Sequence, residues 1–197
     1  MRKLVQLMHV SLDGFVGGPN GEMNFLHVDD EIFDYTGGLV NDCDLGLYGR
    51  VTFEMMENYW PTAVEKPNPT KHDIEHSRWY NNVSKIVLSK SMEGKHLDNV
   101  TILSSDIAHE ISKLKQTDGK NIVVFGSPRA SHYLSQHNLV DDYWLLINPV
   151  ILGEGIPMFT GIKERIKLTL VESKAFSSGV VALHYQKKPD GVLHLPS

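Results

Sequence analysis

Residues 45–54 read Leu45-Gly46-Leu47-Tyr48-Gly49-Arg50-Val51-Thr52-Phe53-Glu54, an apolar strand pattern that ends at a glycine and turns at once into a helical pattern. Glycine lets a ligand approach the backbone closely, and a new helix start offers unpaired N–H groups at the positive end of the helix dipole. Arg50 and Thr52 add a guanidinium group and a hydroxyl. The stretch therefore fits a phosphate-binding turn, and equally an ordinary strand-to-helix turn with a surface arginine.

Similar turns recur later in the chain. Ser89-Lys90-Ser91 follows a predicted strand at 84–89, and Gly126-Ser127-Pro128-Arg129 follows another at 121–125. In open α/β sheets, ligands bind beyond the carboxyl ends of parallel strands, where loops lead into helix N-termini. Three hydroxyl- or cation-bearing turns at successive strand ends favour a nucleotide cofactor.

Length and composition predict one globular domain over residues 1–188 and a loose tail over 189–197. Of the 197 residues, 41% are hydrophobic and 22% are charged, as in ordinary globular proteins. The sequence shows neither an apolar run approaching 18 residues nor the apolar core of a signal peptide, so we expect a cytoplasmic protein that does not bind membranes. A net charge of −5 predicts no nucleic-acid partner. The single cysteine, Cys43, excludes an internal disulfide.

Strand and helix patterns alternate at first and then give way to strands. Strands are predicted at 3–10, 44–48, 84–89, 100–103, 121–125, 142–147, 166–177 and 180–187. Helices are predicted at 29–40, at 51–58, for a turn or two at 73–81, from a Ser105 cap to 116, and from Pro128 after a Ser127 cap. Residues 61–70 form an irregular excursion, and 177–179 a hairpin turn. The order predicts an α/β fold, a mixed and mostly parallel sheet flanked by helices, with a C-terminal antiparallel hairpin.

Several motifs together resemble dihydrofolate reductase and its relative, the reductase domain of riboflavin biosynthesis, which is the C-terminal domain of the bacterial bifunctional deaminase-reductase. Residues 49–54 resemble the Gly-Arg-x-Thr-aromatic-Glu element of the first, and residues 11–16 resemble the opening signature of the second. Residues 123–127 are a further match, and residues 139–145 with 148–159 are similar to a run typical of small stand-alone members. The resemblance covers residues 2–188. It implies a three-layer dihydrofolate reductase-like fold, NADPH as cofactor, and a homodimer.

The resemblance also implies roles for individual residues. It puts Gly49, Arg50 and Thr52 on the cofactor's phosphates, Ser89 and Lys90 near its adenosine-ribose phosphate, and Gly126 and Ser127 at the pyrophosphate. Arg129 belongs to the same turn. The family usually has a glycine pair where this chain has Gly126-Ser127, and the serine side chain would hinder close approach of the cofactor.

Three carboxylates are candidates for the catalytic acid. By position, Asp30 matches the carboxylate that binds the pterin ring in dihydrofolate reductase, with Asp29 as its neighbour; both also suit an ordinary first helical turn. Asp13 lies in a glycine-rich loop, residues 13–18, which resembles the loop that closes over the nicotinamide and also fits a tight hairpin without a catalytic part. Asp13 is therefore the third candidate.

The sequence leaves more than one function open. The leading hypothesis is hydride transfer from NADPH to a small heterocycle, a pterin or a 5-amino-6-ribosylaminouracil-type pyrimidine. A phosphorylated pyrimidine would need cations, for which Arg78 and Arg129 are the candidates. The alternative is a nucleotide-binding protein of the same fold without turnover. His72 and His76 stand four apart, like a zinc pair, but Glu75 is not in the metalloprotease position, so no metal is expected.

Overall fold

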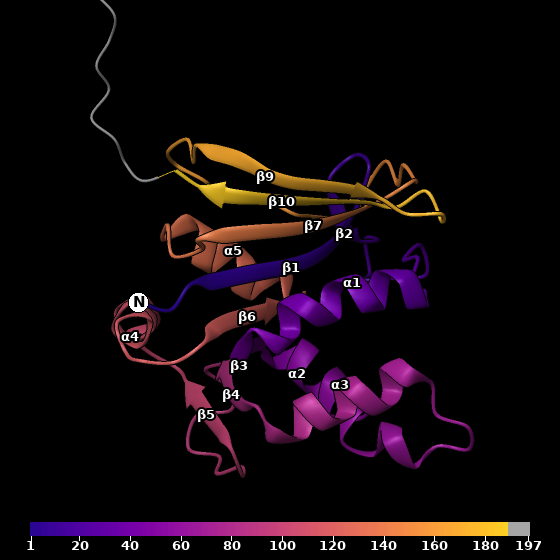
Figure 1. The fold of residues 1–197 in the computed structure, drawn as a ribbon. Helices are drawn as coiled ribbons and strands as arrows, with labels where there is room; N and C mark the ends of the chain where they lie inside the picture. Colours follow the sequence, from indigo (N-terminus) through magenta and orange to yellow (C-terminus); the bar gives the residue numbers. More distant parts are fainter. Residues whose placement is uncertain (189–197) are drawn as a thin grey trace, which may run out of the picture.

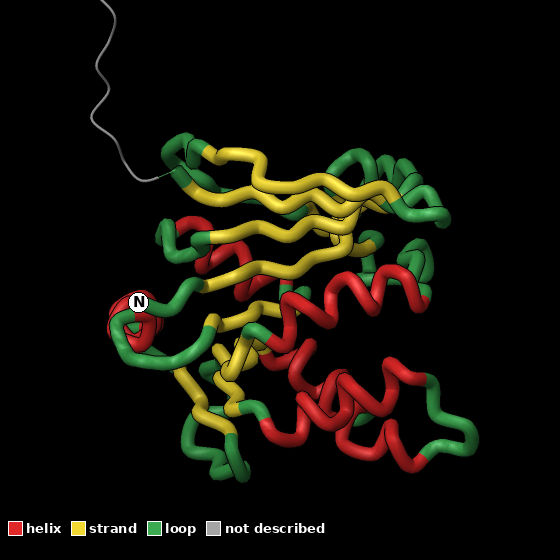
Figure 2. Tube along the Cα trace, viewed as in Figure 1, coloured by secondary structure: helices red, strands yellow, loops and turns green. Residues whose placement is uncertain are grey.

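The structure is a computed structural model that describes residues 1–188, so the predicted tail at 189–197 lies outside the described residues. Eight strands form one sheet in the order β5-β4-β3-β6-β1-β7-β10-β9. Their bounds are β1 Leu4–Ser11, β3 Cys43–Gly49, β4 Ser84–Leu88, β5 Val100–Leu103, β6 Asn121–Phe125, β7 Asp142–Asn148, β9 Leu168–Ala175 and β10 Val181–Lys187. Figure 2 shows them as one continuous twisted layer.

The first six strands in that order run parallel, and β10 pairs antiparallel with both β7 and β9. The predicted mixed sheet with a C-terminal antiparallel hairpin is thus confirmed. The hairpin turns where predicted, with Gly179 at positive φ and its N–H donating to the Phe176 carbonyl. Two short strands form a separate pair, β2 Phe15–Gly17 and β8 Ile156–Pro157. The strand at Ile156 was not predicted, because two residues show no alternation.

Helices cover both faces of the sheet. They are α1 Asp30–Asn41, α2 Arg50–Glu57, α3 Lys71–Asn82, α4 Ile107–Lys115 and α5 Pro128–Gln136, with a 3₁₀ helix η1 at Trp60–Glu65. Figure 1 shows α1, α2 and α3 in front of the sheet and α5 behind it. Residues from the first three pack with Tyr48 and Val123 in one core cluster, and residues from α4 and α5 pack with Leu47 and Ile122 in another. These two cores give the three layers that the resemblance implied.

Two helix starts differ from prediction. The helix α4 begins after Asp106, not at a Ser105 cap, because Asp106 adopts a left-handed conformation with φ 46°. The helix α3 is longer than the predicted turn or two, and it begins at a capping box in which Thr70 and Asp73 satisfy each other's backbone N–H groups. The spacing of Thr70 and Asp73 was the sequence signal for that start.

Gly46 in β3 shows how tightly the core under the site is packed. Tyr48 is fully buried on the same face, stacks on Phe125 at 6.0 Å, and extends its ring over Gly46. A Cβ at Gly46 would lie 2.7 Å from the Tyr48 hydroxyl oxygen. Only glycine leaves room for this tyrosine.

We expect Gly46→Ala to lower the free energy of unfolding by about 1–3 kcal/mol, because the buried Tyr48 ring has nowhere to move. Gly38→Ala is the matched control: a Cβ there meets nothing within 4 Å, and alanine in a helix should raise stability by about 0.5–1 kcal/mol. Urea denaturation of both variants measures the difference. Equal stability of the two would contradict the packing argument.

Candidate functional site

The three predicted turns lie side by side because the strands before them are parallel neighbours. Gly49 pairs with Leu88 across β3 and β4, and β6 lies against the other side of β3. The turns that begin at Gly49, Ser89 and Gly126 therefore leave the sheet at one edge. The sequence prediction that these turns share one strand edge is confirmed.

A hydrogen bond joins two of these turns. The Gly49 N–H donates to the Ser127 hydroxyl oxygen at 3.0 Å. Gly126 and Ser127 both have left-handed backbone, with φ 47° and 53°. This conformation costs a non-glycine residue roughly 1–2 kcal/mol, a cost that glycine at position 127 would avoid. In this chain, the serine at the strained position has its hydroxyl bonded to the neighbouring turn.

The helices that follow these two turns begin without a side-chain cap. Neither Gly49, before α2, nor Ser127, before α5, caps its helix with a side-chain hydrogen bond, whereas Asp29 and Thr70 cap α1 and α3. A Cβ built at Gly126 meets no atom within 4 Å. The first turns of α2 and α5 thus have no side-chain cap, and open space lies beside Gly126, which is an arrangement that suits an oxyanion such as a phosphate.

A cavity of about 490 Å³ opens next to these helix starts. Thr52, Gly126 and Ser127 line it, together with Ile32, Phe33 and Thr36 of α1. The remaining walls come from α3, η1, the loop at 16–28 and the sheet face, including Leu7, His9, Trp60, His76, Trp79, Phe125 and Leu146. Its volume lies in the range of small-molecule sites, and its walls are mostly apolar and aromatic.

The predicted cofactor residues fall into two groups. Gly126, Ser127 and Thr52 line the cavity, and Gly49 is bonded to Ser127. The second group, which does not line the cavity, consists of Arg50, Ser89, Lys90 and Arg129. Arg50 is exposed and donates to Glu54 at 2.7 Å, Ser89 is half-buried, and Lys90 and Arg129 are exposed.

The three predicted acids lie outside the cavity lining. Asp29 caps α1 by accepting the Ile32 N–H at 2.9 Å, and Asp30 is exposed in the first turn. Asp13 accepts hydrogen bonds from the Ser11 hydroxyl and from the Leu152 and Gly153 N–H groups. These bonds, the Ser11 bond first, lower the pKa of Asp13. Asp13 therefore ties the glycine-rich loop to the loop before β8.

Sequence reasoning missed the imidazoles that line the cavity. His72 and His76 were weighed only as a metal pair, and His9 was not considered. Burial lowers the pKa of His76 to about 3, with the nearby His72 adding to the effect, and burial lowers the pKa of His9 to about 4. Burial also lowers the pKa of His72. All three rings are neutral at pH 7.

His76 is the most constrained of the three. Its ring centre lies 4.2 Å from that of Trp60, 5.3 Å from Trp79 and 5.6 Å from Phe125. Its Nε2 is buried and has no hydrogen-bond partner within residues 1–188. A buried polar atom left in this state costs about 1–3 kcal/mol, and a ligand group that bonded to Nε2 would remove that cost. The only sequence signal was the spacing of His72, His76 and Trp79 on one helix.

His9 is held by a buried asparagine. Asn148 is fully buried, and its side-chain amide donates to the Leu146 carbonyl at 3.0 Å and lies 3.4 Å from His9 Nδ1. Its oxygen accepts the His27 N–H at 2.8 Å. When the amide donates to Nδ1, His9 carries its proton on Nε2. Asn148 thus fixes the imidazole and the loop before α1 together.

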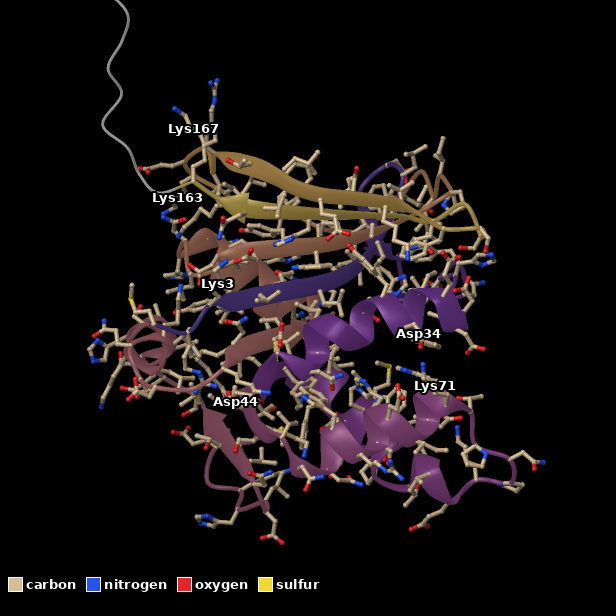
Figure 3. The ribbon with its side chains drawn as sticks, viewed as in Figure 1. Lys3, Asp34, Asp44, Lys71, Lys163 and Lys167 are labelled. Carbon is tan, nitrogen blue, oxygen red and sulfur yellow. The ribbon has the colours of Figure 1, made fainter. Side chains whose placement is uncertain are left out.

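Two contacts join α1 to α3 beside the cavity. The rings of Phe33 and His72 stack face to face at 3.5 Å, and Lys71 donates to Asp34 at 2.6 Å. Figure 3 shows Asp34 and Lys71 pointing toward one another from the two helices. The helix walls are therefore joined by contacts that involve only side chains.

Within the described part of the chain, no three His, Cys, Asp or Glu side chains come close enough to hold a metal ion. None of the helices in residues 1–188 is long and apolar enough to cross a membrane.

Comparison with known proteins agrees with this geometry. The family model of the RibD C-terminal domain matches residues 2–182. The chain belongs to this family. It is 36% identical over 187 residues to the uncharacterized protein YyaP of Bacillus subtilis (strain 168), covering 93% of this chain and 94% of YyaP.

Solved structures of family and fold relatives share the architecture. A proposed riboflavin biosynthesis protein from Shewanella sp. PV-4 superposes with a TM-score of 0.69 at 20% identity, covering 96% of this chain and all of that one. Dihydrofolate reductase from Enterococcus faecalis, solved with NADP(H), gives 0.62 at 16% identity, covering 95% of this chain and 97% of that one. The RibD C-terminal domain described here therefore has the dihydrofolate reductase-like fold, and that resemblance is confirmed.

The buried His76 makes stability depend on pH. Its pKa in the folded protein is about 3, below the ordinary 6.5, so between these values the unfolded chain binds a proton that the folded chain does not. The free energy of unfolding should therefore fall as pH is lowered from 6.5, by roughly 1.4 kcal/mol per pH unit from this residue. Urea denaturation at pH 7, 6 and 5 should show a shallower fall in His76→Phe and His76→Gln. Slopes parallel to wild type would contradict the burial of this imidazole.

Proposed function

We propose that this protein is an NADPH-dependent reductase that transfers hydride to a small heterocycle, a pterin or a 5-amino-6-ribosylaminouracil-type pyrimidine. The observation that supports this is the pair of uncapped helix starts at the end of an aromatic cavity. Family membership and a fold shared with reductases agree with it. The cytoplasmic location and the homodimer stay predictions of the sequence.

The residues present fit such a cofactor. The N–H groups at the starts of α2 and α5 would hold the pyrophosphate, with Gly126, Ser127 and Thr52 beside them. Arg50, Ser89 and Lys90, at the outer side of the same edge, would hold the adenosine-ribose phosphate, and Arg129 a further phosphate oxygen. When bound, the nicotinamide ring supplies the hydride. The protein's part is to orient that ring toward the cavity and to exclude water with apolar walls.

For the proton we keep the candidates Asp30, Asp29 and Asp13, and the structure adds Glu75. Glu75 belongs to α3 and, within the described residues, is the one carboxylate that lines the cavity. The predicted acids lie outside the lining, which favours the alternative of a nucleotide-binding protein without turnover. Oxidation of NADPH in the presence of candidate pterins and pyrimidines separates the two: binding without oxidation would support the alternative.

We expect the wild type to bind NADPH more tightly than NADH. Arg50→Ala should weaken NADPH binding roughly ten- to 150-fold, because a hydrogen bond to a charged group contributes about 1.5–3 kcal/mol to the binding free energy. Isothermal calorimetry measures both. Glu54→Gln is the matched control, because it removes the partner of Arg50 and leaves the guanidinium free, so affinity should be kept or increased. Unchanged affinity in Arg50→Ala would remove this arginine from the site.

For the acid, Asp30→Asn should slow single-turnover oxidation of NADPH by about 10²–10⁴-fold while changing cofactor affinity little. Asp29→Asn is the neighbouring control, because asparagine caps a helix as well as aspartate does. If both variants react at the wild-type rate, the proton comes from another group, and Asp13→Asn and Glu75→Gln are the next variants to measure.

A further inference from the structure

We call the part of the cavity lined by α1 and α3, including Phe33, His72, Glu75 and His76, the α1–α3 end, and it carries no positively charged side chain. Among the described residues that line the cavity there is neither a lysine nor an arginine. Arg78 and Arg129, the sequence candidates for a substrate phosphate, are both exposed and outside the lining. Lys71, next to His72, is already bonded to Asp34. A phosphate group at this end would therefore lack a cationic partner.

The titratable groups of the α1–α3 end also disfavour the binding of a phosphate group. His72 and His76 face each other at 5.3 Å between ring centres, and burial keeps both neutral at pH 7. Glu75 lies between them in sequence, lines the cavity and is exposed, so its carboxylate repels an anion that approaches. Dianionic phosphate esters are therefore disfavoured here by both missing attraction and direct repulsion.

The flat aromatic walls of the α1–α3 end and the unpaired Nε2 of His76 in the described residues indicate which kind of ligand fits there. Trp60, His76, Trp79 and Phe125 present flat rings, and the buried Nε2 of His76 has no partner in the described chain. A neutral imidazole nitrogen donates or accepts one hydrogen bond, as the ring nitrogens and carbonyls of pteridines and pyrimidines do. The side-chain groups thus suit a planar, polar and uncharged ring.

We propose that this end of the cavity selects an unphosphorylated, uncharged pteridine or pyrimidine, with His76 Nε2 bonded to the ring. The proposal rests on the proposed function, whose substrate class it narrows. It separates this chain from an enzyme whose substrate carries a ribose phosphate. The phosphates of the cofactor would lie instead at the backbone N–H groups in the first turns of α2 and α5.

The test uses two matched pairs of probes, dihydroneopterin with its 3′-phosphate and 5-amino-6-ribitylaminouracil with its 5′-phosphate. Calorimetry on the full chain, with and without NADPH, should show at least one unphosphorylated probe binding about tenfold or more tightly than its phosphate ester. Equal or tighter binding of the phosphate esters would overturn the proposal, and so would binding of none of the four probes.

Variants of cavity residues test whether the preference for unphosphorylated probes arises in the cavity. Glu75→Lys should reduce or reverse the preference, because it replaces a repelling charge with an attracting one, whereas Glu65→Lys, the same charge change on exposed η1 outside the lining, should keep it. His76→Phe, checked for folding by thermal unfolding, should weaken the unphosphorylated probe about tenfold. An unchanged preference in Glu75→Lys, or unchanged affinity in His76→Phe, would contradict the assignment.

The same titrations distinguish this inference from the proposed function. If NADPH fails to bind the wild type, the reductase proposal fails whichever probe is preferred. If NADPH binds and the phosphate esters are preferred, the substrate inference alone fails.

Discussion

The parallel direction of six neighbouring strands is the constraint on which the site depends. Parallel strands end at the same edge, so the turns after β3, β4 and β6 must lie next to one another although they are separated along the chain by about 40 residues each. The bond from the Gly49 N–H to Ser127 then holds two of these turns together, and no side chain of Gly49 or Ser127 caps the helices α2 and α5. A side-chain cap at either position would have used the groups that an anion needs.

The cavity lining combines two chemically different sets of residues. Residues at the starts of α2 and α5 contribute backbone dipoles, which attract negative charge without any buried cation. At the α1–α3 end, packing of Phe33 on His72 and of Trp60 on His76 takes imidazoles out of water and keeps them uncharged. One continuous space thus combines anion-attracting helix starts with a neutral aromatic end, and this combination suits a dinucleotide beside a flat, uncharged ring.

Sequence patterns predicted the regular parts of the fold well. The strands β5 and β6 begin and end where expected, because each is a short run rich in β-branched residues that is bounded by polar residues. The failures are local conformations without periodicity. The left-handed Asp106 moved the start of α4, β8 has only two residues, and the capping box at Thr70 extended α3 beyond the predicted turn or two.

The sequence by itself determined the order of the elements, the position of the phosphate-compatible turns and the family, because each depends on residues close together in the chain. Only the tertiary structure decided which side chains face the cavity. His76 became a buried, neutral group without a partner for Nε2 in the described residues through Trp60 and Phe125, which come from other elements, and Ser127 became the partner of the Gly49 N–H through the pairing of β3 with β6. Burial and partner choice depend on what distant segments bring near a residue, and no local pattern contains that information.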